Sequence, residues 1–114
     1  MTVRDVVDKL ELEVLTGTAC LDRTVTGGYA SDLLSDVIAH GEAGNLWVTL
    51  QTHGNIVAVA TLKDLAAVVL VNGRRPDGEA VERARQEKVL LLATAQPAFE
   101  IAGRMYQLGV RGRP

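Results

Sequence analysis

A polar segment that ends in two glycines carries the residue types best suited to binding a ligand. It combines a carboxylate, a guanidinium and two hydroxyls with the glycine pair, in the order Asp22, Arg23, Thr24, Thr26, Gly27 and Gly28. A guanidinium binds phosphate or carboxylate through paired hydrogen bonds, and an aspartate accepts from a ribose or an amide. Adjacent glycines allow positive φ and close approach of the backbone to another group. The spacing therefore predicts a turn that faces an anionic ligand or satisfies its own polar groups.

The sequence leaves both interpretations of this segment open. In the first, Arg23 binds an anionic ligand and Tyr29, directly after the glycines, covers that ligand or a partner subunit. In the second, Asp22 caps its own turn and Arg23 pairs with an acid such as Asp32 or Asp36. The glycine pair matches neither a dinucleotide-binding fingerprint nor a P-loop, so those two phosphate-binding routes are excluded.

A second polar segment, with Thr52, His53 and Asn55, interrupts two apolar runs. His53 has the chemistry of an acid–base or ligand-binding group, and the alternative is that it fixes its loop by hydrogen bonds. Cys20 is expected to be a small buried hydrophobe, although Arg23 offers the electropositive setting of a reactive thiol. No order of Ser, His and Asp or of Cys and His supports a catalytic constellation, and the histidines and scattered acids make a poor metal site. We therefore predict no catalytic residues, no metal site and no cofactor.

Hydrophobic periodicity predicts the elements that hold these segments in place. Apolar residues at helical spacing predict helices over residues 3–10, 33–38 and 97–108, with Thr2 and Ser31 in capping positions, and a charged helix is predicted over residues 79–88. The apolar segment 56–62 fits a strand or a buried helix, and Asn55 in a capping position favours the helix. Apolar runs predict strands within residues 11–16, 46–50, 66–71 and 89–93. Trp47, Phe99 and Tyr106 are expected in the core.

The strands do not alternate polar and apolar residues, which is typical of a mainly parallel sheet with helices on both faces. The carboxyl ends of parallel strands share one edge, where ligands usually bind. Four loops are expected to meet there, over residues 18–28, 51–55, 72–78 and 94–97. Each leads into a helix N-terminus, whose amide groups and dipole favour an anion.

Composition limits the class of protein. The length of 114 residues fits one domain, predicted over residues 1–110 with a flexible tail at 111–114. A net charge of −2 gives no basic surface for nucleic acid, and the longest apolar run is too short to cross a membrane. The single cysteine excludes an intrachain disulfide, and nothing resembles a secretory leader, so we expect a cytoplasmic protein that binds neither nucleic acid nor membrane.

Taken together, the motifs resemble the DRTGG domain family. The resemblance rests on Asp22-Arg23 to Gly27-Gly28-Tyr29, the segment 31–37 and the segment 51–60, and it extends from about Val3 to Val110. The eponymous Asp, Arg, Gly and Gly fall on Asp22, Arg23, Gly27 and Gly28, while Thr24 and Thr26 both match the threonine. That family is similar to the amino-terminal domain of HPr kinase/phosphorylase, which implies a three-layer α/β/α fold around a four-stranded, mainly parallel sheet.

The resemblance also implies a class of function. DRTGG domains occur as regulatory or dimerising modules beside CBS domains, and free-standing versions resemble those encoded near iron hydrogenase subunits. We therefore expect a non-catalytic regulatory module that forms a homodimer or docks on a larger enzyme and senses a nucleotide or other anionic metabolite. The alternatives are an assembly subunit without a ligand and a small enzyme that uses His53 or Cys20.

Overall fold

The chain folds around one sheet of five strands with helices on both faces. A computed structural model describes residues 1–112. The α-helices are α1 (Val3–Leu10), α2 (Leu34–His40), α3 (Asn55–Lys63), α4 (Gly78–Glu87) and α5 (Ala98–Leu108). The strands are β1 (Glu13–Val14), β2 (Gly27–Ala30), β3 (Asn45–Thr49), β4 (Ala67–Leu70) and β5 (Leu91–Ala93), and a 3-10 turn covers Thr18–Cys20. Within residues 1–112, no helix has the length and apolar character needed to span a bilayer.

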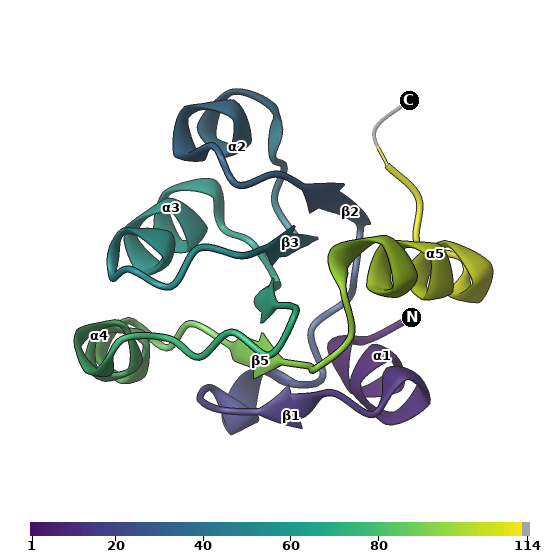
Figure 1. The fold of residues 1–114 in the computed structure, drawn as a ribbon, viewed down its shortest axis with the longest axis horizontal. Coiled ribbons are helices and arrows are strands. Elements are labelled where there is room, and N and C mark those ends of the chain that lie inside the picture. The colour runs from purple at the N-terminus through teal and green to yellow at the C-terminus, as the bar shows by residue number, and fades with distance from the viewer. Residues whose placement is uncertain (113–114) are drawn as a thin grey trace.

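The sheet order is β1-β5-β4-β3-β2, so four strands lie in parallel and one edge strand does not. Figure 1 shows α2, α3 and α4 on one face and α1 and α5 on the other. This arrangement confirms the predicted α/β fold with three layers. The sheet has one strand more than the four expected, because the glycine pair at the end of the polar segment forms the first half of β2.

β2 was expected to be part of a loop. It begins at Gly27, and its register on β3 pairs Gly28 with Leu46 and Tyr29 with Trp47. Glycine has a low strand propensity, so local sequence argues against this strand. Pairing with the buried strand β3 overrides that preference.

The direction of β1 places the polar segment at the opposite edge of the sheet from the one expected. It pairs antiparallel with β5, Glu13 opposite Ala93, so the loop that follows it leaves at the amino ends of the parallel strands. The prediction that the loop of residues 18–28 joins the other three loops at the carboxyl edge is therefore wrong.

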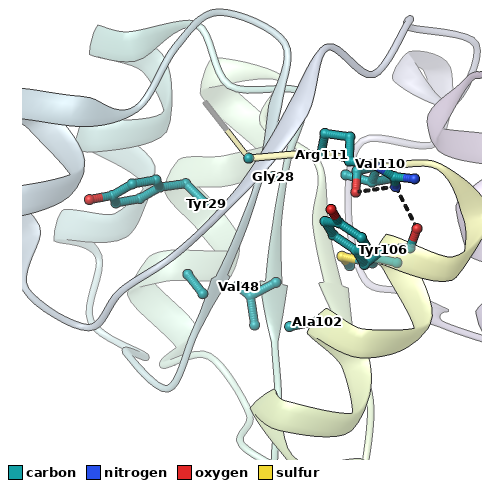
Figure 2. Close-up of a pocket in the computed structure, with 10 residues that line it drawn as sticks. Gly28, Tyr29, Val48, Ala102, Tyr106, Val110 and Arg111 are labelled. Atoms are coloured by element: carbon teal, nitrogen blue, oxygen red, sulfur yellow. Dashed lines mark hydrogen bonds between the residues drawn. The ribbon is translucent and has the colours of Figure 1, made fainter. Parts of the chain in front are cut away.

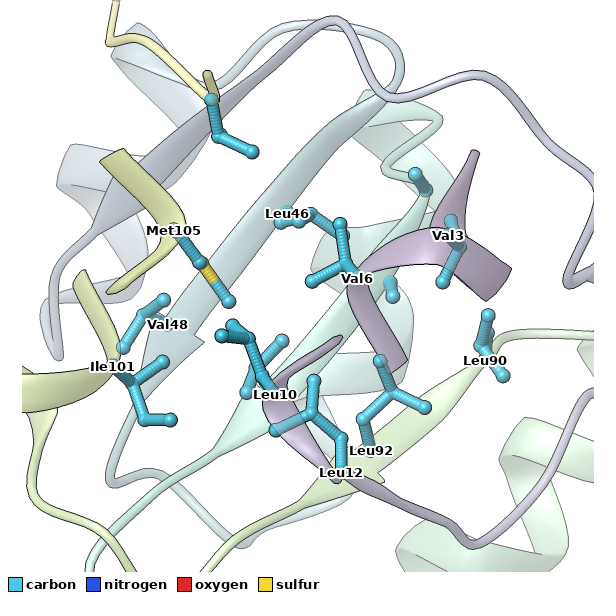
Figure 3. Packing of buried hydrophobic residues seen from close by; sticks show 14 of the residues in the cluster. Val3, Val6, Leu10, Leu12, Leu46, Val48, Leu90, Leu92, Ile101 and Met105 are labelled. Atoms are coloured by element: carbon cyan, nitrogen blue, oxygen red, sulfur yellow. The ribbon is translucent and has the colours of Figure 1, made fainter. Parts of the chain in front are cut away.

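Two hydrophobic clusters fill the space between the sheet and its helices. One lies under α1 and α5, where Figure 3 shows Val6, Leu10 and Met105 directed toward Leu46, Val48 and Leu92 of the sheet. The other lies under α2, α3 and α4 and includes the fully buried Trp47. Burial of such aliphatic side chains contributes about 1.5–3 kcal/mol each, so these clusters are the main source of stability.

Of the three capping residues that the sequence predicted, one caps its helix and two do not. Thr2 and Asp5 form the predicted capping box of α1. Ser31 accepts from the backbone of Leu33 before α2 begins, and Asn55 is the first residue of α3 rather than its cap.

Two of the three aromatic residues expected in the core are on the surface. Phe99 and Tyr106 of α5 are 86% and 58% exposed, whereas Trp47 is buried as expected. The periodicity of α5 alone did not reveal that these two rings are exposed.

Candidate functional site

Arg23 is held at the amino edge of the sheet by the end of α3. Its Nη1 donates to the Asp64 carboxylate at 2.9 Å and its Nη2 donates to the Asp64 carbonyl at 2.8 Å. Asp64 is the C-cap of α3, with φ 53°, and Arg23 holds the pKa of this carboxyl below its usual range. The second interpretation paired Arg23 with an acid such as Asp32 or Asp36. Arg23 does pair with an acid, but the acid is Asp64, because Asp32 and Asp36 lie toward the opposite edge.

Asp22 and Thr24 join the same corner to α1. The Arg4 Nε donates to the Asp22 carboxylate at 3.0 Å, and the Arg4 amide donates to the Leu21 carbonyl. Thr24 forms an isolated antiparallel bridge with Thr2, next to the cap of α1. The side chain of Asp22 therefore joins two elements, where the sequence suggested a cap on its own turn.

Thr26 binds the loop before β3. Its hydroxyl donates to the Ala43 carbonyl at 2.7 Å and accepts from the Asn45 side chain at 3.1 Å. Gly44, with φ +82°, fits against Thr26, since a Cβ there would lie 2.6 Å from the Thr26 methyl. We call residues 22–28 the corner segment; its two charged groups and the Thr26 hydroxyl bind other parts of the chain.

The glycine pair makes room for the C-terminal segment. A Cβ on Gly27 would lie 2.7 Å from the Arg111 carbonyl, and one on Gly28 would lie 3.2 Å from the side chain of Val110. The Gly28 amide donates to that same Arg111 carbonyl at 3.0 Å. The expected close approach thus occurs, but neither glycine has the positive φ that a turn would need. Arg111, predicted to begin a flexible tail, packs on β2; Arg113 and Pro114 lie outside the described residues.

Tyr29 faces the opposite side of the sheet from the C-terminal segment. Its hydroxyl donates to the Asp36 carboxylate at 2.9 Å, and His40 Nδ1 lies 3.0 Å from the other oxygen of that carboxylate. Hydrogen bonds from Ser31, Tyr29 and His40 lower the pKa of Asp36. Tyr29 thus contributes to a polar cluster on α2.

Thr52, His53 and Asn55 lie at the carboxyl edge of the sheet. The Asn55 amide donates to His53 Nδ1 at 3.1 Å, and the Thr52 carbonyl accepts from the amide of Asp77. Asp32, in the neighbouring loop, accepts from Thr49 and from the amide of Leu50. His53 fixes the start of α3, as the second interpretation of this residue proposed.

Apart from Tyr29, whose hydroxyl binds α2, the candidate residues form two groups, which α3 connects. Asn55 begins α3 at the carboxyl edge, and Asp64 ends it where Arg23 binds. The nine residues of α3 extend over roughly 14 Å. Asp64 was absent from the sequence prediction, because no local pattern shows that a residue 41 positions away pairs with Arg23.

No catalytic arrangement links the two remaining reactive side chains. The Cys20 thiol donates to the Lys88 carbonyl at 3.6 Å, at the amino edge, and His53 is at the carboxyl edge. Among residues 1–112, no three His, Cys, Asp or Glu side chains gather as a metal site would require.

The fold has a relative among solved structures. The chain is similar to the CBS and DRTGG domains of the regulatory region of Clostridium perfringens pyrophosphatase, crystallised with its activator, diadenosine tetraphosphate. The TM-score is 0.73 at 12% identity, over 90% of this chain and 44% of that chain. No family model matches the sequence, and no curated protein matches it. The comparison confirms a DRTGG-like fold, and the chain spans less than half of that structure.

Proposed function

We propose that this chain is a non-catalytic regulatory module that senses a nucleotide or another anionic metabolite and acts on a larger metabolic or hydrogenase-type enzyme. The likeness to the regulatory region of a pyrophosphatase, which extends over 90% of the chain, carries this proposal. That region is complexed with an activating nucleotide, so the fold occurs where a nucleotide controls an enzyme.

In this proposal the metabolite binds at the carboxyl edge, at Thr52, His53 and Asn55. Amide groups at the start of a helix favour an anion. An anion there would compete with the His53 ring for the amide of Asn55. Displacement of this ring would alter the start of α3, and the other end of α3 is held by Arg23 in the corner segment. We therefore propose α3 as the connection between metabolite and corner.

Thermal denaturation with AMP, ADP, ATP and diadenosine tetraphosphate tests the sensing function. A ligand at 100 times its Kd stabilises the folded state by about 2.7 kcal/mol. For a domain of this size, that corresponds to a rise in Tm on the order of 10 °C. We expect at least one of the four compounds to produce it.

The matched variants are His53→Ala at the proposed site and Arg85→Ala on the exposed side of α4. His53→Ala should reduce the nucleotide-induced rise in Tm, and Arg85→Ala should retain it. If none of the four compounds changes Tm, the metabolite-sensing function is contradicted and the docking function alone remains.

A second candidate is an assembly subunit or homodimer without a ligand. The observation that favours it is the corner segment, whose polar groups bind α1, α3 and the loop before β3. If the corner also supports a subunit contact, Arg23→Ala should lower the sedimentation coefficient of the oligomer and leave nucleotide binding unchanged. An unchanged oligomer with lost nucleotide binding would favour the sensing module instead.

A further inference from the structure

A groove of about 170 Å³ lies between β2 and α5. Its floor is formed by the small residues Gly28 and Ala30 and by Val48, and its wall by Ala102 and Met105. Tyr29, Tyr106 and the C-terminal segment of residues 110–112 complete the lining. Figure 2 shows Tyr106 and Arg111 on one side of β2, with the ring of Tyr29 directed to the other side.

The strand beside this groove is the outer strand of the sheet. The Gly28 amide points away from β3, since it donates to the Arg111 carbonyl. Strand residues two apart present their backbone groups to the same side, so the Ala30 amide also points outward. Edge strands usually carry charged residues that prevent pairing with other chains. β2 has the sequence Gly-Gly-Tyr-Ala and carries none.

The opposite edge of the sheet differs in this respect. β1 has two residues, and its Glu13 forms a two-armed ion pair with Arg75, at 2.9 Å for each hydrogen bond. A short, charged edge strand resists the addition of another strand. On β2, the Arg111 carbonyl already occupies the Gly28 amide, and Ala30 beyond it is exposed. Of the two edges, β2 is therefore the one suited to pair with an extended segment, and it would pair at Ala30.

The size and charge of the groove indicate what it would accept. Pockets for drug-sized ligands have volumes of about 300–1,000 Å³, so this groove suits one apolar side chain rather than a nucleotide. The one charged residue that lines it is Arg111. The guanidinium of Arg111 lies 3.9 Å above the Tyr106 ring, and both of its hydrogen bonds to backbone carbonyls use Nη1. Its other nitrogens have the geometry to bind a carboxylate.

We propose that an extended segment of a partner protein pairs with Ala30 at the outer edge of β2, next to the C-terminal segment that occupies the Gly28 amide. An apolar side chain of that segment fills the groove, and an acidic residue near it pairs with Arg111. Backbone pairing supplies affinity and the pocket supplies specificity in this mode of recognition. A second copy of this chain fits less well, because self-pairing of β2 about a two-fold axis would bring two Arg111 side chains together. The inference rests on the proposed function, since it names how the regulatory module would dock.

Synthetic peptides with the full chain test this inference. The probe is a hexapeptide, Thr-Val-Leu-Thr-Glu-Thr, with lysine in place of its glutamate in one control and N-methylated backbone amides in another. In ¹⁵N–¹H NMR titrations, the parent peptide should shift the amides of Gly28, Ala30 and α5 and slow the hydrogen exchange of Ala30. The lysine peptide should bind at least tenfold more weakly, and the methylated peptide should not bind.

Two variants separate the charge from the backbone pairing. Arg111→Glu should weaken the glutamate peptide at least tenfold and strengthen the lysine peptide, whereas Arg85→Glu should change neither. Ala30→Pro removes only an outward amide, which an edge strand tolerates, and should abolish binding in a protein whose spectrum remains folded.

Three results would overturn the inference: no shift at millimolar peptide, shifts outside β2 and α5, or an affinity that Arg111→Glu leaves unchanged. These results are independent of the nucleotide experiment. Nucleotide stabilisation without peptide binding would refute the inferred docking surface and support the sensing function. Peptide binding without nucleotide stabilisation would refute the sensing function and support the docking surface.

Discussion

At the scale of single residues, the glycine pair has a packing function that its sequence only partly revealed. Gly27 and Gly28 allow the C-terminal segment to lie directly on β2. The clash that a methyl group would cause at Gly27 is with a backbone carbonyl, which has little freedom to move.

Gly27→Ala should therefore destabilise the protein by about 1–3 kcal/mol, the usual cost of an overpacked site. Urea denaturation measures the change. The matched control is Gly103→Ala, where a Cβ meets no other atom within 4 Å in the interior of α5. That control should stabilise the protein by about 0.5–1 kcal/mol, because alanine favours a helix. Equal stability of the two variants would contradict the close packing at β2.

Asp36 is expected to make stability depend on pH. Its folded-state pKa lies below 3.8, so its hydrogen bonds stabilise the protein above that pH and are lost as the pH falls through the folded-state value. In urea denaturation from pH 6 to pH 2, Asp36→Asn should reduce the loss of stability below about pH 4. The exposed Glu82→Gln serves as the control. The idea fails if both variants follow the wild-type curve.

At the scale of elements, the sequence predicted most helices and the central strands because their apolar patterns are local. The patterns of α1, α4 and α5 follow helical spacing, β4 and β5 are continuous apolar runs, and β3 has an apolar centre. β2 escaped prediction because its pairing with β3 outweighs its weak propensity. The direction of β1 also lay beyond the sequence, because two residues carry no pattern that distinguishes parallel from antiparallel pairing.

The sequence predicted the candidate site only in part, because local patterns do not show how strands pair. The types of chemistry in the corner segment and at residues 52–55 were evident, but their grouping depended on sheet topology. Because β1 runs antiparallel to β5, the corner segment lies at the amino edge of the sheet, whereas His53 lies at the carboxyl edge.

Trp47 joins β3 to the end of β2. Its indole nitrogen donates to the Ser31 carbonyl at 2.8 Å, and the side chain is fully buried. Trp47→Phe should cost about 1–3 kcal/mol for the unpaired carbonyl, in addition to the lost volume. Phe99→Leu, at an exposed site, should change stability by less than about 0.5 kcal/mol. Equal unfolding midpoints in guanidinium would show that the indole hydrogen bond contributes nothing.

At the scale of the whole molecule, stability should decrease from the centre of the sheet toward its edges. Val68 and Val69 of β4 are fully buried between two layers of helices, while Ala30 on β2 is exposed. Native-state hydrogen exchange should therefore be slowest for amides in β3 and β4, approaching the global unfolding free energy. The Ala30 amide should exchange at least a hundredfold faster. Uniform protection across the sheet would contradict this gradient.

The antiparallel pairing of Glu13 with Ala93 has a consequence for synthesis. The first helix and strand leave the ribosome early, yet their partners β5 and α5 are made last. The native surface around their apolar side chains, Val3, Val6 and Leu10, is incomplete until then, because Leu92, Ile101 and Met105 belong to the same cluster. During translation these residues wait for the synthesis of β5 and α5, so a chaperone that binds nascent apolar segments has that interval in which to bind them.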